Sequence, residues 1–206
     1  MFKTASFTLL FISALSLSLN AKQNQAHLII PEMTIESINE HVNKADKEFT
    51  CLYCYSYHCD WCDYHLPFVL SLLKDFNNIN FTLLIIDRAS DTIDISNCIN
   101  HIIKQDLCIN MNNIQILSDS LYNREYRYLK PQSTKRFLRI YGGRKEGNKY
   151  INFIEKFIPT GLNKEPIEPK VIICKKNGGV VFTNSGDEHA WFSKEDEKLL
   201  KQILKE

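Results

Sequence analysis

Residues 51–67 read CLYCYSYHCDWCDYHLP, a stretch with two close pairs of cysteines and a proline at its end. The overlapping residues 48–55 are rich in aromatic and apolar side chains and predict a strand. Residues 60–77 carry apolar side chains at helical spacing and predict a helix, bent or broken at Pro67. The continuous apolar run at 79–86 predicts a strand buried on both faces. Together these segments predict a βαβ unit with parallel strands and a right-handed crossover.

Cys59 and Cys62 fall at the predicted start of this helix. Unpaired N–H groups and the dipole at a helix N-terminus stabilise an anion, which lowers the pKa of a thiol there. The thiolate is the form that attacks a disulfide, so we expect Cys59 to attack. Cys62 lies on the same face of the first turn, where it can resolve a mixed disulfide. A protonated His58 would favour the thiolate, whereas Asp60 and Asp63 oppose it by like charge.

In this layout the chain resembles the thioredoxin family. The family pattern is a strand, a short loop, a Cys-x-x-Cys pair opening a long helix, and a proline five residues after the second cysteine, where Pro67 stands. A second hallmark is a cis-proline that opens a strand leading into a lysine–asparagine–glycine hairpin. The segment EPKVIICKKNGGVVF, residues 168–182, fits this hallmark with Pro169. Pro159 is the alternative, but no strand is predicted after it.

The resemblance implies an α/β thioredoxin-like fold, with a central mixed sheet flanked by helices and an inserted block at about residues 88–168. It implies a thiol–disulfide oxidoreductase that reduces protein disulfides. It also implies that no organic cofactor is needed, because a redox-active Cys59–Cys62 disulfide carries the electrons. Its partners would be protein disulfides or dithiols and a redox protein that recycles the pair. The site residues implied are Cys59 and Cys62 for catalysis, Trp61, Glu168 and Pro169 for substrate binding, and His58, Asp60 and Pro67 for modulation.

Three positions depart from the family pattern. The dipeptide between the cysteines is Asp60-Trp61 rather than the family's commonest Gly-Pro. Tyr53 stands where cytoplasmic thioredoxins carry a buried acid that assists proton transfer. Glu168 precedes the expected cis-proline, where apolar residues or threonine are usual. These departures leave the redox potential and the direction of electron flow open.

The first 21 residues differ from the rest of the chain. Lys3 is the only charged residue before Lys22, and FTLLFISALSLSL at 7–19 is followed by the small residue Ala21. A membrane span needs about 20 apolar residues, so the segment predicts a cleaved export signal at 1–21, with an uncleaved anchor as the alternative. We therefore expect residues 22–206 to form a periplasmic or otherwise exported domain without a membrane span. The formal net charge of +1 gives no field that would attract nucleic acid.

Seven cysteines keep a second class of function open, a metal-binding protein on the same fold. Cys51, Cys54, Cys59 and Cys62 have the spacing C-x2-C-x4-C-x2-C, which could hold zinc. Residues three apart on a strand point to opposite faces, however, so we expect the first two to be packing residues. A copper metallochaperone would instead use two cysteines and a distant histidine such as His189.

The other elements follow from periodicity and turn chemistry. Helices are predicted at 33–45, 95–107 and 120–130, and a strand at 113–118. A hairpin is predicted to join RFLRIY (136–141) to KYINFIEKF (149–157), and a second to join KVIICKK to VVFTN through Asn177-Gly178-Gly179. Ser193 and Asp196 predict the start of a last helix. Cys98 and Cys108 would be too far apart along a helix to bridge, and Cys174 is expected to be buried.

Overall fold

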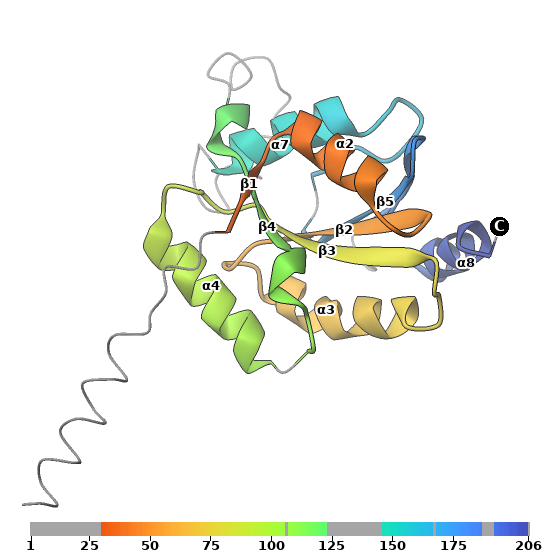
Figure 1. Cartoon of the computed structure of the whole chain (residues 1–206), viewed down its shortest axis with the longest axis horizontal. Coiled ribbons are helices and arrows are strands. Elements are labelled where there is room, and N and C mark those ends of the chain that lie inside the picture. The colour runs from red at the N-terminus through yellow and green to blue at the C-terminus, as the bar shows by residue number, and fades with distance from the viewer. Residues whose placement is uncertain (1–29, 106, 123–145, 167, 187–191, 206) are drawn as a thin grey trace, which may run out of the picture. The chain divides into compact units, whose positions relative to one another are not determined.

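The structure is a computed structural model of the 206-residue chain, and it describes residues 30–105, 107–122, 146–166, 168–186 and 192–205 (Figure 1). The chain divides into two units, Met1–Ile30 and Pro31–Glu206. The expected export signal lies outside the described residues, and the helices and strands that the structure describes belong to the second unit. Within the described ranges, no helix is both long enough and apolar enough to cross a membrane.

The described part of the chain contains a mixed sheet of six strands. Its order is β1 (Glu32–Met33), β4 (Ile114–Leu117), β3 (Ile79–Ile85), β2 (Phe49–Tyr55), β5 (Lys170–Lys175) and β6 (Gly179–Thr183). The first four strands pair in parallel, whereas β5 is antiparallel to β2 and β6 to β5. The predicted βαβ unit is therefore confirmed, with Phe49 opposite Ile79 and Tyr55 opposite Ile85.

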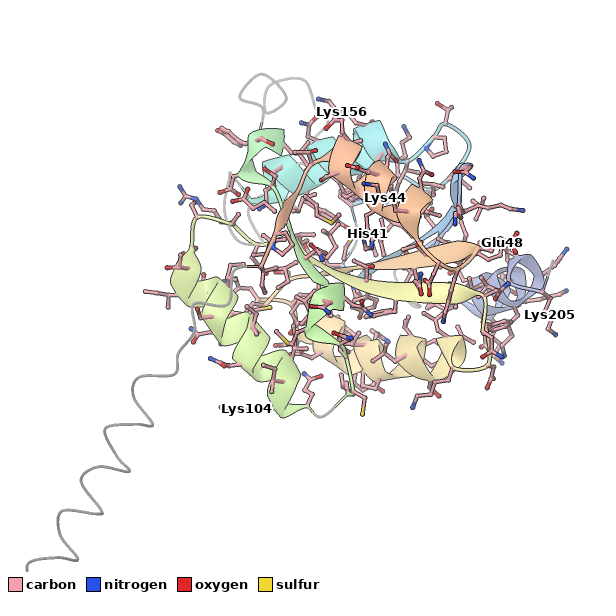
Figure 2. The ribbon with its side chains drawn as sticks, viewed as in Figure 1. His41, Lys44, Glu48, Lys104, Lys156 and Lys205 are labelled. Carbon is pink, nitrogen blue, oxygen red and sulfur yellow. The ribbon has the colours of Figure 1, made fainter. Side chains whose placement is uncertain are left out.

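Helices cover both faces of this sheet, as expected for the α/β class. Helices α2 (Ile35–Lys44) and α7 (Glu146–Phe157) lie over one face, and α3 (Asp60–Leu73) and α4 (Thr92–Lys104) over the other (Figure 1). Helix α8 (Lys194–Ile203) follows β6. From α2, His41 reaches the sheet, where its Nε2 lies 3.0 Å from Thr82 Oγ1 (Figure 2).

The core under α2 and α7 shows how β2 divides its cysteines between faces. Cys54 and Cys174 belong to this core, together with Val42 and Phe153, whereas Cys51 does not. Cys51 and Cys54 are both fully buried, and none of the chain's seven cysteines is bonded to another. This arrangement agrees with the prediction that Cys51 and Cys54 point to opposite faces of the sheet and are packing residues.

Local signals set the ends of several elements. Ser193 and Asp196 form the predicted reciprocal capping box at the start of α8, because each side chain accepts from the other residue's backbone N–H. The β5–β6 hairpin is also confirmed, with Asn177 and Gly179 at φ of 62° and 78° in its turn. Asn and Gly suit such left-handed conformations.

The prediction of a hairpin ending in KYINFIEKF was wrong, because this segment lies in helix α7. Tyr150, Phe153 and Ile154 are buried at helical spacing, and so is Ile158 one turn later. The segment RFLRIY lies outside the described residues, as does 123–130 of the predicted helix at 120–130. The start of that predicted helix belongs to the 3-10 turn η2 (Asp119–Leu121), and another such turn, η1 (Met111–Asn113), precedes β4.

The remaining predicted bounds differ by a few residues. The helix predicted from residue 33 begins at Ile35, because Met33 instead pairs with Leu117 in β1. Helix α4 spans Thr92–Lys104, so Cys98 is buried within it while Cys108 lies beyond its end and is exposed. The inserted block at about residues 88–168 supplies strand β4 of the sheet and helix α7, which covers one face of the sheet.

Candidate active site

Cys59 is the N-cap residue of α3, so the predicted position at the helix start is confirmed. The backbone N–H of Cys59 donates to the carbonyl of Ser56, and the N–H of Cys62 donates to the carbonyl of Cys59 at 2.9 Å. Helix α3 continues through Pro67. Cys59 is 3% exposed and Cys62 is fully buried, so a bulky partner can reach only the first of the two sulfurs.

The two thiols differ in acidity. A hydrogen bond from the Cys62 side chain lowers the pKa of Cys59, and backbone N–H groups of Cys62 and Trp61 lower it further, against burial and the charge of Asp60. Burial raises the pKa of Cys62 well above its ordinary value, and its hydrogen bond to Cys59 adds to the rise. The site therefore favours a thiolate on Cys59 and a thiol on Cys62, which supports the expected division into attacking and resolving cysteines.

The loop that opens β5 lies against the Cys59 sulfur. In its protonated form, the Cys59 thiol donates to the main-chain oxygen of Glu168 at 3.8 Å. The Glu168–Pro169 peptide bond is cis, and β5 begins directly after it. These features match the family hallmark at Pro169, whereas the segment after Pro159 forms no strand.

The side chain of Glu168 is also part of the site, which sequence reasoning did not anticipate. One carboxylate oxygen of Glu168 and the sulfurs of Cys59 and Cys62 all lie within 4.8 Å of one another. The Oε2 atom is buried and has no hydrogen-bond partner among the described residues. Burial raises the pKa of Glu168 well above its ordinary value, and the charges of Cys59 and Asp87 raise it further. The one sequence signal was an acid at a position where the family usually has apolar residues or threonine.

Asp87 and Lys149 hold the loop that precedes Cys59. The buried Asp87 carboxylate accepts from Ser56 Oγ at 2.9 Å and from the Tyr57 backbone N–H at 2.7 Å. Lys149 Nζ, from α7, donates to the main-chain oxygen of Asp87 at 2.6 Å. Burial raises the pKa of Asp87, while the hydrogen bonds from Tyr57 and Ser56 oppose the rise. The end of β3 and helix α7 thus position the approach to the helix α3 N-terminus.

Tyr53 occupies the position of the family's buried acid, but it has a different role. Its hydroxyl donates to the main-chain oxygen of Cys62 at 2.8 Å. Burial raises the pKa of Tyr53, with further contributions from the nearby cysteines, so its phenol stays protonated. A protonated phenol cannot serve as a proton acceptor for Cys62.

The two aspartates of the motif have separate surroundings. Asp60 raises the pKa of Cys59, as predicted. The Asp63 carboxylate instead accepts from the Tyr55 hydroxyl at 2.5 Å and from Gln105 at 2.9 Å, and its Oδ2 lies 2.8 Å from His101 Nε2. Asp63 therefore joins α3 to β2 and α4.

Aromatic side chains on α3 are exposed beside the cysteines. Trp61 is 61% exposed and Tyr64 is 73% exposed, so both can contact a partner. Trp61 stacks on His65 with ring centroids 5.5 Å apart. His58 Nε2 lies 3.3 Å from Asp94 Oδ2. The structure thus places Trp61, Glu168 and Pro169 around Cys59, while His189 lies outside the described residues.

The four cysteines of the hypothetical zinc site do not gather into one group. Among the residues that the structure describes, the cysteines that meet a third potential ligand are Cys59 and Cys62, with Glu168. Metals bind thiolates and carboxylates, so ligands must lose their protons first. A metal ion at this position would have to displace the protons that burial keeps on Cys62 and Glu168.

The strand order, the crossover through α3, the Cys-x-x-Cys pair at its N-terminus and the cis-proline beside it define a thioredoxin-like fold. No family model matches the sequence. The comparison with curated proteins gives no match either.

Three solved structures are similar to parts of this chain. The thioredoxin domain of a Bacteroides vulgatus thiol-disulfide oxidoreductase has a TM-score of 0.42 and 11% identity, covering 80% of this chain and 83% of its own. A thioredoxin-family thiol:disulfide interchange protein from Chlorobium tepidum has a TM-score of 0.41 and 12% identity, covering 81% and 84%. A secreted Mycobacterium tuberculosis disulfide oxidoreductase has a TM-score of 0.38 and 11% identity, covering 77% and 81%.

Proposed function

We propose that the protein is a thiol–disulfide oxidoreductase in which Cys59 and Cys62 form the reactive couple. The observation that carries the proposal is the placement of the pair: Cys59 is the N-cap residue of α3 and its sulfur faces the main-chain oxygen of Glu168, while Cys62 is fully buried. Cys59, which retains some exposed surface, has a lowered pKa, and the fully buried Cys62 has a raised one. A structural disulfide or a chance pair of cysteines requires no such division, whereas dithiol–disulfide exchange does.

In the reducing direction, the Cys59 thiolate attacks one sulfur of a substrate disulfide. A bond forms between Cys59 Sγ and that sulfur, the substrate S–S bond breaks, and the first substrate thiolate leaves and is protonated. Cys62 then loses its proton and attacks Cys59 Sγ, which releases the second substrate thiolate. The substrate gains two electrons and two protons, the cysteines become a disulfide, and a partner dithiol restores them.

We propose a protein substrate and a reductase direction. Trp61 offers exposed aromatic surface beside the reactive sulfur, and the Glu168–Pro169 loop lies against that sulfur. Backbone groups of this loop would pair with an extended peptide that carries the substrate disulfide. Residues 1–21 support export of the protein, in which case a reductase requires an electron donor that reaches the same compartment.

A mixed-disulfide trap tests this function. The Cys62→Ser variant is made in a Cys108→Ser background, because Cys108 is the exposed cysteine outside the pair. We expect covalent adducts through Cys59 that disappear on reduction, and none in the matched protein that also carries Cys59→Ser. Adducts that persist in the matched protein, or their absence from the trap, would contradict the proposal.

The competing hypothesis is a metal-binding protein, either a copper metallochaperone or a zinc-stabilised module. Elemental analysis of purified protein separates the two hypotheses. We expect substoichiometric zinc and copper in both the unmodified chain and the Cys59→Ser variant. One equivalent of metal in the former that is lost in the latter would favour metal binding over redox exchange.

A further inference from the structure

The Glu168 carboxyl group lies beside the two cysteines of the site. One of its oxygens and the sulfurs of Cys59 and Cys62, at the start of α3, all lie within 4.8 Å of one another. Oε2 is buried without a hydrogen-bond partner in the described part of the chain. The main-chain oxygen of the same residue faces Cys59 Sγ at 3.8 Å, so the contact with α3 holds this residue beside the reacting atoms.

The other ionisable groups around Glu168 are unsuited to exchange a proton with the couple. Cys54 of β2 and Tyr150 of α7 interact with Glu168, and burial raises the pKa of both, so both stay protonated. The Asp87 carboxylate, beyond β3, accepts hydrogen bonds from Ser56 and Tyr57. In β5, Lys170 donates its ammonium group to the main-chain oxygen of Asn184 at 3.1 Å, and burial lowers its pKa to about 8, so it stays charged at neutral pH and below. Glu168 is left as the acid whose carboxyl group lies near both sulfurs.

We propose that Glu168 carries the second proton of the couple: its carboxyl group is protonated in the reduced site and ionised in the oxidised site. The inference rests on the proposed thiol–disulfide exchange. A buried site tolerates one negative charge better than two, because like charges at short range in a low dielectric repel strongly. While Cys59 is a thiolate, the carboxyl group therefore keeps its proton, and when the disulfide forms the charge passes to the carboxylate.

The steps balance in protons and electrons. Cys59 attacks the substrate disulfide, and the departing substrate thiolate takes the proton of Glu168. The Glu168 carboxylate then accepts the proton of Cys62, Cys62 closes the disulfide, and the second departing thiolate takes that proton. The reduced site holds a thiolate, a thiol and a carboxylic acid. The oxidised site holds a disulfide and a carboxylate, so two electrons and two protons have left at a constant charge of minus one.

This stoichiometry has a measurable consequence in equilibrium with glutathione. Glutathione disulfide also takes up two protons with two electrons below the ordinary thiol pKa of about 8.5. For the unmodified site, the equilibrium constant with glutathione is therefore independent of pH. In a Glu168→Gln variant one proton is missing from the exchange, so the constant for oxidation by glutathione falls about tenfold per pH unit as pH rises.

The experiment measures this constant from about pH 6 to pH 7.5, below the ordinary thiol pKa. All proteins carry Cys108→Ser, and ultraviolet thiolate absorbance defines the pH range in which Cys59 is ionised. Glu165→Gln is the matched control, because Glu165 is an exposed acid of the same loop. We expect constants independent of pH with Glu168 present, including in this control, and about a tenfold fall per pH unit in Glu168→Gln.

Equal pH dependence in Glu168→Gln and Glu165→Gln overturns the inference, and so does a tenfold fall per pH unit with Glu168 present. In both cases the cysteines still exchange with glutathione, so the proposed function survives. Failure of the pair to exchange at all overturns both. If Glu168→Gln does not fold, the infrared difference between the oxidised and reduced unmodified protein decides. A protonated-carboxyl band in the reduced state that disappears on oxidation is expected, and an unchanged band contradicts the inference.

Discussion

Replacing Lys149 with methionine tests how the site is held in place. Lys149 is 1% exposed, and its ammonium group donates to the main-chain oxygens of Asp87 at 2.6 Å and Leu117 at 2.8 Å. It also donates to the Asp119 carboxylate at 2.8 Å. Methionine fills a similar volume but leaves these three acceptors without the cation. The change therefore isolates the buried charge and its hydrogen bonds from packing.

The expected loss of unfolding free energy in Lys149→Met follows from these three hydrogen-bond partners. Breaking a fully buried ion pair from one side destabilises a protein by roughly 3–5 kcal/mol, and leaving a buried acceptor unsatisfied by roughly 1–3 kcal/mol. The Asp119 side chain is 35% exposed and can turn to water, so we expect a loss of about 3 kcal/mol. For a chain of this size that lowers Tm by about 6–12 °C.

The loss should also depend on pH. Burial raises the pKa of Asp119, but the hydrogen bond and charge of Lys149, together with hydrogen bonds from the Ala89 and Ser90 backbone, lower the pKa overall. The stabilisation from this lowered pKa is present above the unfolded value of about 3.9 and is lost as pH falls through the folded value. The difference between the unmodified protein and Lys149→Met should therefore shrink below about pH 4.

Urea unfolding followed by far-ultraviolet circular dichroism measures this loss. Lys156→Met is the matched control, because Lys156 is exposed on the outer side of the same helix (Figure 2). We expect the control to change the free energy of unfolding by less than about 0.5 kcal/mol. If Lys149→Met and Lys156→Met differ by less than about 1 kcal/mol, the reasoning from unsatisfied buried acceptors is refuted.

Three further changes probe the site and the core. Asp60→Asn removes a charge that raises the pKa of Cys59, so the midpoint of its alkylation-rate profile should move to lower pH; an unchanged midpoint would contradict this. Asp63→Ala removes an acceptor shared by β2 and α4 and should lower the free energy of unfolding by about 1–3 kcal/mol, whereas a loss below about 0.5 kcal/mol would show that the network is unimportant. Burial raises the pKa of Cys174 to about 12. The stability that this thiol contributes is complete below about pH 8.5 and declines as pH rises toward the folded value. Cys174→Ala should therefore make the alkaline decline in the free energy of unfolding shallower, by up to about 1.4 kcal/mol per pH unit. Equal slopes of unfolding free energy against pH in the unmodified protein and Cys174→Ala, measured by urea unfolding between pH 8.5 and 10, would contradict this prediction.

Local patterns were sufficient for the elements that carry the motif. The apolar runs on either side of the helix at Cys59 predicted β2, α3 and β3, and the turn at Asn177 predicted the last hairpin. Ser193 and Asp196 predicted the start of α8. In each case the signal lies within a few residues, because capping, turn chemistry and strand burial depend on near neighbours.

Features that depend on distant contacts were not predictable. The segment at Tyr150 has apolar residues at both strand-like and helical spacing, and only packing against the sheet selects the helix. Strand β1 is too short to show a pattern and exists through its pairing with β4. The carboxyl group of Glu168 enters the site from a loop 109 residues away from Cys59, so its burial is a property of the assembled fold.

The central claim is that Cys59 and Cys62 form a reversible dithiol–disulfide couple. Its most direct test equilibrates the Cys108→Ser protein with glutathione buffers of varied ratio, followed by acid quenching, alkylation in denaturant and mass measurement. We predict a single two-electron transition in which both cysteines lose their free thiols together, and its loss when Cys59 or Cys62 is replaced by serine. Free thiols at both positions under every ratio, or glutathione bound to Cys59 without closure by Cys62, would contradict the claim.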